Sequence, residues 1–303
     1  MTRHPSFGLF LALCGALVLT PDTLFMRWSG MGALEMIAWR GLLMGAVFIG
    51  AWVVFRRHVW HNDLRGLVSS SGITVILCQF AGAVLFSYAI AEAPVSVVLF
   101  GVATVPVFSA ILAYLLLGEE THASTWLAMV MVIGGIGIAV FGGTSGSTMG
   151  SREALLGAVA GLAVALFVAL NFVSLRRNPG VPILLANGGG ALLAGAVSLG
   201  IVGPVAVWHG DVWAIVFTGV LILPISFFLL SMATRHTTTA NVSLVMLVET
   251  VLGPGWVWLG TGQRPTDAMF IGGAVVVGTL ALYLGYADRR KLRAARRPAF
   301  SDV

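Results

Sequence analysis

Residues 87–121 read SYAIAEAPVSVVLFGVATVPVFSAILAYLLLGEET, and this stretch decides the fold. Its central part, from Val95 to Leu117, carries no charged side chain, whereas Glu92 and Glu119 stand just outside it. About 20 apolar residues are enough for a helix to cross the hydrocarbon core of a bilayer. The stretch therefore predicts a transmembrane helix with an acidic residue beyond each end.

The remainder of the 303-residue chain has the same character, since 58% of its residues are hydrophobic and another 38 are glycine. Charged residues make up 10%, against about 25% in soluble domains, which excludes a water-soluble globule. We therefore expect an all-α integral membrane protein. Its ten transmembrane helices are expected at Phe7–Met26, Ala33–Phe55, Leu67–Ala91, Val95–Leu117, Thr125–Phe141, Ala154–Leu175, Pro182–Val202, Val212–Ala233, Ala240–Leu259 and Met269–Tyr286.

The basic residues indicate how these helices are oriented. With the N-terminus in the cytoplasm, thirteen Lys and Arg residues fall inside and only Arg27, Arg152 and Arg264 fall outside. The positive-inside rule then places both termini in the cytoplasm. Six of the inside residues lie between Asp288 and Arg297, which is typical of a juxtamembrane tail facing anionic lipid and argues against nucleic-acid binding.

A glycine- and serine-rich segment, Gly142 to Ser151, lies near the middle of the chain and reads as a linker. Offsets of 144 and 149 positions align the apolar windows on its two sides, so we expect an internal duplication. Because five is odd, the second copy must enter the membrane from the opposite side, which gives two inverted five-helix repeats. The expected units are repeats at 1–142 and 153–287, a linker at 143–152 and a basic cytoplasmic tail at 288–303.

Several motifs resemble the EamA repeat of the drug/metabolite transporter superfamily. They are Ser87–Ser96, Thr104–Ala110, Leu117–Thr121, Trp39-Arg40-Gly41 and Gly134–Gly137. In the second half, Glu249-Thr250 stands where the family often has Glu-Pro, and Gly262-Gln263 stands where Gly-Glu is usual. The resemblance implies a ten-helix basket in the bacterial inner membrane, with a central cavity formed mainly by the third, fourth, eighth and ninth helices. Length and aromatic richness look most like the amino-acid exporters of this family.

Ionisable residues inside apolar spans are costly and are therefore functional candidates. Asp22 lies about 6 Å from the outer end of the first helix and Arg40 about 10 Å from that of the second, at about 1.5 Å per residue. We expect them to form a structural ion pair, although Arg40 could instead bind a substrate carboxylate. Glu249, near the middle of the ninth helix, could accept an interhelical hydrogen bond, contact a substrate amine or carry a coupled proton.

Uncharged candidates for substrate binding are polar or aromatic side chains flanked by apolar residues. Gln79 shares one face of the third helix with Ala83 and Phe86 at helical spacing. Packing between helices or against lipid is the alternative for each of these candidates. The expected binding residues are Gln79, Ala83, Phe86, Phe100, Thr104, Phe167, Asn171, Ser243 and Glu249.

Prolines within spans remove a helical hydrogen-bond donor and permit bending. Pro21, Pro106, Pro224 and Pro254 are the candidates for gating or helix bending. No P-loop or cofactor motif occurs in the sequence, so we expect no cofactor. His58-x-x-His61 with Asp63 has metal-compatible spacing but lies in a short basic segment, which favours a solvated loop and no metal.

Together these features predict a secondary transporter and not an enzyme. It would export small metabolites, foremost aromatic or other neutral amino acids, across the inner membrane by alternating access. Because both repeats lie in one chain, we expect a monomer that needs only its substrate and the surrounding lipid. The alternatives are efflux of cationic drugs or other metabolites, a pore, and a membrane-embedded lipid enzyme.

Overall fold

The computed structural model describes residues 5–93, 95–141, 151–262 and 267–295. In these segments the first half forms α1 (Pro5–Leu19), α2 (Asp22–Ser29), α3 (Ala33–Arg56), η1 (Arg57–Val59), α4 (Trp60–Val68), α5 (Ser70–Glu92), α6 (Val95–Val102), α7 (Val105–Leu117) and α8 (Ala123–Phe141). The second half forms α9 (Ser151–Arg177), α10 (Ile183–Val202), η2 (Ala206–Trp208), α11 (Val212–Phe217), η3 (Thr218–Ile222), α12 (Leu223–Ala233), α13 (Thr239–Met246), α14 (Val248–Thr261) and α15 (Asp267–Ala295).

Within the described residues, eight helical stretches are long and apolar enough to cross a membrane. Two shorter apolar helices, Ala123–Ile138 and Phe270–Tyr283, complete the ten expected positions. The all-helical membrane class predicted from the sequence is confirmed.

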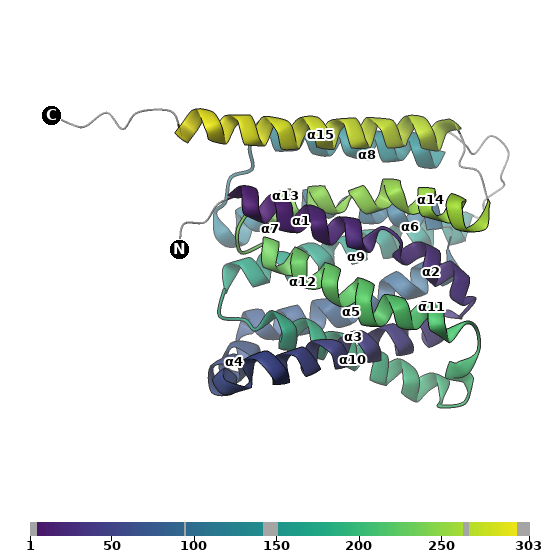
Figure 1. Ribbon diagram of the computed structural model, residues 1–303. Coiled ribbons are helices and arrows are strands. Elements are labelled where there is room, and N and C mark those ends of the chain that lie inside the picture. Colours follow the sequence, from purple (N-terminus) through teal and green to yellow (C-terminus); the bar gives the residue numbers. More distant parts are fainter. Residues whose placement is uncertain (1–4, 94, 142–150, 263–266, 296–303) are drawn as a thin grey trace.

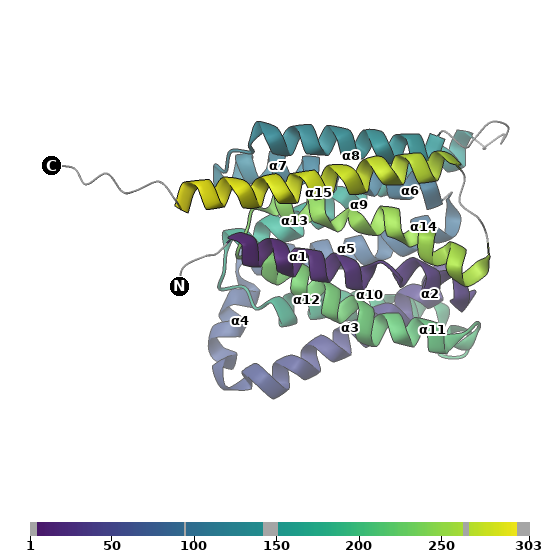
Figure 2. The ribbon, with the colours of Figure 1, turned by 45° about the horizontal axis from the view of Figure 1, so that its top comes forward.

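The long helices run side by side, so that the bundle has two ends (Figure 1). The start of α1 and the end of α15 lie at the same end, where α4 is also found (Figures 1 and 2). We call this the basic end, because α3, α9 and the turn after α12 bring Arg56, Arg176 and Arg235 there. The opposite end carries Arg27 at the last turn of α2.

The main helix pairs join the two halves of the chain. α3 packs along α10, α5 along α9, α8 along α15 and α1 along α12. Figures 1 and 2 show α8 and α15 together on one side of the bundle. Close approach of α3 and α10 depends on small residues, since a Cβ atom on Gly41 would lie 2.6 Å from the backbone nitrogen of Gly195.

Two expected boundaries differ from the structure. Leu67 and Val68 belong to α4 and not to the third membrane helix, because the Ser69 side chain caps α5 by accepting a hydrogen bond from the Gly72 amide at 3.1 Å. α15 continues to Ala295, so the first part of the expected tail is helical, as its Arg, Lys, Leu and Ala residues favour. The expected linker lies outside the described residues up to position 150.

Candidate functional site

A cavity of about 110 Å³ lies between the two halves of the chain. Its lining is apolar apart from a small number of polar groups and the three ionisable residues described below. The lining residues include Leu19, Asp22, Ile37, Arg40, Gly41, Met44, Cys78, Gln79, Gly82, Ala83, Phe86, Ser87, Leu99, Val102, Val164, Val168, Asn171, Phe172, Ala191, Leu223, Phe227, Met246, Glu249 and Thr250.

The lining involves more helices than the family resemblance implied. α3 and α9 contribute four residues each, although neither belongs to the four helices expected to form the cavity. The broken first membrane helix, α1 with α2, contributes Leu19 and Asp22. The cavity is therefore enclosed by helices of both halves, which is the arrangement expected of a site shared between repeats.

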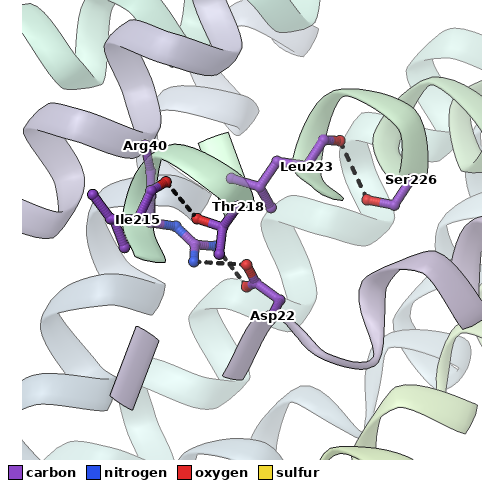
Figure 3. Close-up of polar contacts among 6 residues, drawn as sticks. All are labelled: Asp22, Arg40, Ile215, Thr218, Leu223 and Ser226. Atoms are coloured by element: carbon purple, nitrogen blue, oxygen red, sulfur yellow. Dashed lines mark hydrogen bonds and ion pairs between the residues drawn. The ribbon is translucent and has the colours of Figure 1, made fainter. Parts of the chain in front are cut away.

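Asp22 and Arg40 meet in a buried, bidentate ion pair at the cavity wall. The Arg40 guanidinium donates hydrogen bonds of 2.9 and 2.8 Å to the two carboxylate oxygens of Asp22 (Figure 3). Their side chains are only 9% and 2% exposed. Such pairs are held strongly once formed, because removing one partner leaves a buried charge without compensation.

Local sequence explains the position of Asp22. Pro21 lies at the break between α1 and α2, and Asp22 is the first residue of α2. The Thr20 side chain accepts a 2.9 Å hydrogen bond from the Trp256 indole, which ties this break to α14. An acidic residue in the first turn of a helix is also favoured by the helix dipole.

Glu249 lies in a comparable place, in the first turn of α14 directly after the break at Leu247. It lines the same cavity as Asp22 and Arg40 and is half-buried. Within the described parts of the chain, no hydrogen bond or ion pair reaches its carboxylate. Glu249 is thus the acidic group of the cavity that has no protein partner of this kind.

The α5 candidates lie where their spacing indicated. Gln79, Ala83 and Phe86 all line the cavity, together with Gly82 and Ser87 of the same helix. Ser87 was not singled out from the sequence, although its position four residues after Ala83 places it on the same face.

Asn171 lines the cavity and is also part of a hydrogen-bond network between helices. Its amide donates to the Asn187 side-chain oxygen at 3.0 Å, and the Asn187 amide donates to the Ser231 hydroxyl at 3.1 Å. This network connects α9, α10 and α12, in line with the tendency of polar residues in lipid to find partners on other helices.

Four expected binding residues lie away from the cavity lining. Ser243 is buried and donates to the Thr239 carbonyl oxygen at 2.7 Å, and Thr104 donates to the Gly101 carbonyl oxygen at 2.6 Å. Phe100 packs beside the cluster that contains Ala103 and Met129. Phe167 is half-buried and absent from the lining, whereas Phe227 is part of it.

Three of the four candidate prolines stand at helix irregularities. Pro21 lies between α1 and α2, Pro106 is at the second position of α7 directly after a break, and Pro224 follows the π-helical turn η3. Pro254 lies inside α14, seven residues after the break at Leu247. Around η3, the Thr218 and Ser226 hydroxyls donate to the carbonyl oxygens of Ile215 and Leu223 (Figure 3).

The basic end holds a polar network around Arg176, which the sequence did not single out. Arg176 forms a 2.7 Å ion pair with Glu119 and donates to the carbonyl oxygens of Thr234 and Thr237 at 2.9 and 2.7 Å. Nearby, Arg235 donates to the Val181 carbonyl oxygen at 2.6 Å. Burial, and next the charge of Arg56, lowers the pKa of Arg235.

The cavity lies near the middle of the bundle, since its lining on α9 ends at Phe172, four residues before Arg176. On α3 it extends from Ile37 to Met44, the half of the helix far from Arg56. On α5 it extends from Cys78 to Ser87, again nearer the end that lies away from the basic residues. The Arg176 network therefore lies between the cavity and the basic end.

Comparison with known proteins agrees with this architecture. Residues 6–141 match the EamA-like transporter family. A chain of a solved crystal structure, 20% identical, matches with a TM-score of 0.75 over 94% of this chain and 98% of that chain, which shows that the fold is shared. No curated protein is significantly similar in sequence. The first half of the chain therefore carries an EamA-like transporter domain, and the apolar helices are those of a multi-pass membrane protein.

Proposed function

We propose that this protein is a secondary transporter that exports small zwitterionic metabolites, foremost neutral or aromatic amino acids, by alternating access. The observation that carries the proposal is the cavity bounded by two helix breaks, at Pro21 and Leu247, with the Glu249 carboxylate facing it. Broken helices at mid-membrane are a recurring device for binding substrate in secondary transporters.

Each part of an amino acid has a matching group in the cavity. The ammonium group would pair with Glu249, and an apolar side chain would pack against Phe86 and Phe227. The substrate carboxylate would accept hydrogen bonds from Gln79 or compete with Asp22 for Arg40. A phosphorylated substrate fits less well, because Arg40 is the cation in the lining and Asp22 already neutralises it.

During the transport cycle, the cavity would open alternately at one end of the bundle and at the other. The pairing of helices supports two inverted repeats. Exchanging the two halves of the chain would turn the pair α1 with α12 into the pair α9 with α5, and both pairs are present. The pairs α3 with α10 and α8 with α15 each join a helix to its counterpart in the other half. The Arg176 network suggests a carrier that faces away from the basic end. With both termini cytoplasmic in a bacterial inner membrane, the cavity here would face the periplasm.

Efflux of cationic compounds is the second candidate, and it rests on the two carboxylates, Asp22 and Glu249, in the lining. Counterflow in proteoliposomes separates the candidates. Vesicles are loaded with one unlabelled compound from a panel of neutral amino acids, aromatic amino acids and tetraphenylphosphonium, and then receive trace labelled compound with and without a pH gradient. Saturable accumulation with amino acids supports the proposal, accumulation with the cation alone supports the second candidate, and linear equilibration would indicate a pore.

A further inference from the structure

The short helix α4 is not a solvated loop, as the sequence had suggested, but a helix with three distinct faces. At 3.6 residues per turn, Asp63 and Gly66 share the face turned toward the protein. Asp63 is only 3% exposed, and a Cβ atom on Gly66 would lie 3.1 Å from the Cδ of Pro182. The first face therefore packs α4 against α3 and the turn before α10.

Asp63 fixes this orientation. Its carboxylate accepts hydrogen bonds from the Trp52 indole at 2.8 Å and from the Arg56 guanidinium at 3.0 and 2.9 Å. Both donors belong to the last turns of α3. The Arg56 hydrogen bond also keeps the pKa of Asp63 below its usual value, so the carboxylate stays ionised and continues to accept both donors.

The second face is apolar and exposed, with the Trp60 ring also lying against the neighbouring His61 ring. Trp60, Leu64 and Val68, spaced by four residues, are 47%, 40% and 71% exposed. The exposed apolar surface of α3 continues to the end of that helix, since Val54 and Phe55 are each 72% exposed just before Arg56. The third face is polar and carries the exposed side chains of His61, Asn62 and Arg65.

We propose that α4 is an interfacial helix that binds the surface of the phospholipid bilayer at the basic end. Trp60, Leu64 and Val68 enter the boundary between headgroups and acyl chains, and Arg65 pairs with anionic headgroups. A Trp-containing apolar face next to a basic polar face is the pattern that anchors helices in this layer. Figure 2 shows α4 lying across the end of the bundle, whereas the membrane helices run along it, as such an anchor requires.

α4 connects α3 with α5, and both of these helices line the cavity. Any movement of α3 relative to α5 must be accommodated by α4 at the bilayer surface.

The test uses the full chain in liposomes, with Cys14→Ala and Cys78→Ala removing the native thiols. A nitrobenzoxadiazole label is attached at Leu64→Cys and, as the matched control one face away, at Asn62→Cys. Val68→Cys replaces Leu64→Cys if the latter variant does not fold. Quenching is measured with phosphatidylcholine spin-labelled at acyl carbon 5 and with aqueous iodide.

We expect the label at position 64 to be quenched by the lipid spin label and shielded from iodide, and the label at position 62 to show the reverse. Equal iodide quenching at the two positions would overturn the inference. When the spin label is carried by phosphatidylglycerol, the quenching at position 64 should correspond to about fivefold enrichment of this anionic lipid beside the label, relative to phosphatidylcholine. A fivefold enrichment is equivalent to about 1 kcal/mol, the attraction of one basic residue to an anionic surface. Arg65→Gln should abolish this enrichment, and no enrichment with Arg65 present would contradict the headgroup contact. Neither readout depends on transport.

Discussion

Arg40 on α3 donates to both carboxylate oxygens of Asp22, the residue that begins α2 directly after the first helix break. The ion pair thereby joins a continuous helix to a broken one at the wall of the cavity. Among the described residues, it leaves Glu249 as the carboxylate of the cavity lining without such a partner, and this is the group proposed to pair with a substrate ammonium.

Exchange of the two residues tests the structural part of this ion pair. Arg40→Ala or Asp22→Ala alone should lower the free energy of unfolding by about 3–5 kcal/mol, because the remaining charge is buried without its partner. The double exchange Asp22→Arg with Arg40→Asp should recover much of that loss, measured as thermal stability in detergent by size-exclusion chromatography. If the exchange is no more stable than the single variants, the pair does not stabilise the fold in this way.

Glu249→Gln tests the substrate contact. The variant should fold normally but lose at least about tenfold in counterflow rate for amino acids, since one charge-assisted contact contributes roughly 1.5–3 kcal/mol. Glu92→Gln is the matched control, because Glu92 is exposed at the end of α5. A wild-type rate with unchanged pH dependence in Glu249→Gln would remove Glu249 from the mechanism.

Arg176→Gln should open the basic end. The variant loses the Glu119 ion pair and the hydrogen bonds to Thr234 and Thr237, which together close the three helix ends around it. In a Cys14→Ala background and inside-out vesicles, we expect an impermeant methanethiosulfonate to label Cys78 at least about tenfold faster.

Arg177→Gln provides the control for this variant, since Arg177 is adjacent but exposed. Cys78 is only 4% exposed and lines the cavity, so its labelling reports access from the basic end. Equal labelling in Arg176→Gln and the wild type would show that the network is not a closure.

Asp63→Asn should weaken the attachment of α4 to α3. Because the hydrogen bond from Arg56 lowers the pKa of Asp63, the carboxylate stabilises the fold above its unfolded pKa, about 3.9, and this contribution disappears as the pH falls through the lower folded value. We expect a loss of about 1 kcal/mol at pH 7, since Arg56 is half exposed.

The wild type and Asp63→Asn should therefore converge in stability at acidic pH. Asp211→Asn, an exposed carboxylate that caps no backbone amide with its side chain, is the control. A stability difference that stays constant down to pH 3 would argue against the pKa of Asp63 as its cause.

Hydropathy alone was enough to predict the membrane helices, because an uncharged apolar run of about 20 residues has few other stable structures. The proximity of Asp22 and Arg40 could also be predicted, because the rise per residue of a helix gives the depth of each residue below the outer end of its span. Gln79, Ala83 and Phe86 could be grouped on one face for an equally local reason.

Other features depend on contacts between distant segments and could not be predicted. The break at Leu247 has no proline beside it, so nothing local distinguishes it from a continuous helix. Ser243 and Thr104 looked like cavity residues, but their hydroxyl groups donate to carbonyls of the preceding turn. In the sequence, Arg176 is only one of the basic residues that indicate topology. Its role as a network centre depends on the fold, which brings Glu119 and Thr237 from distant turns into contact with it.

Blocking the cavity is the most direct test of whether substrate passes through it. Ala83 lines the cavity on α5, whereas Leu77 of the same helix is 55% exposed on the outer surface. Amino-acid counterflow is measured for Ala83→Trp and Leu77→Trp, both shown to be monodisperse. We expect Ala83→Trp to lose at least about tenfold in rate and Leu77→Trp to keep the wild-type rate. A wild-type rate in Ala83→Trp would show that substrate does not pass through the cavity.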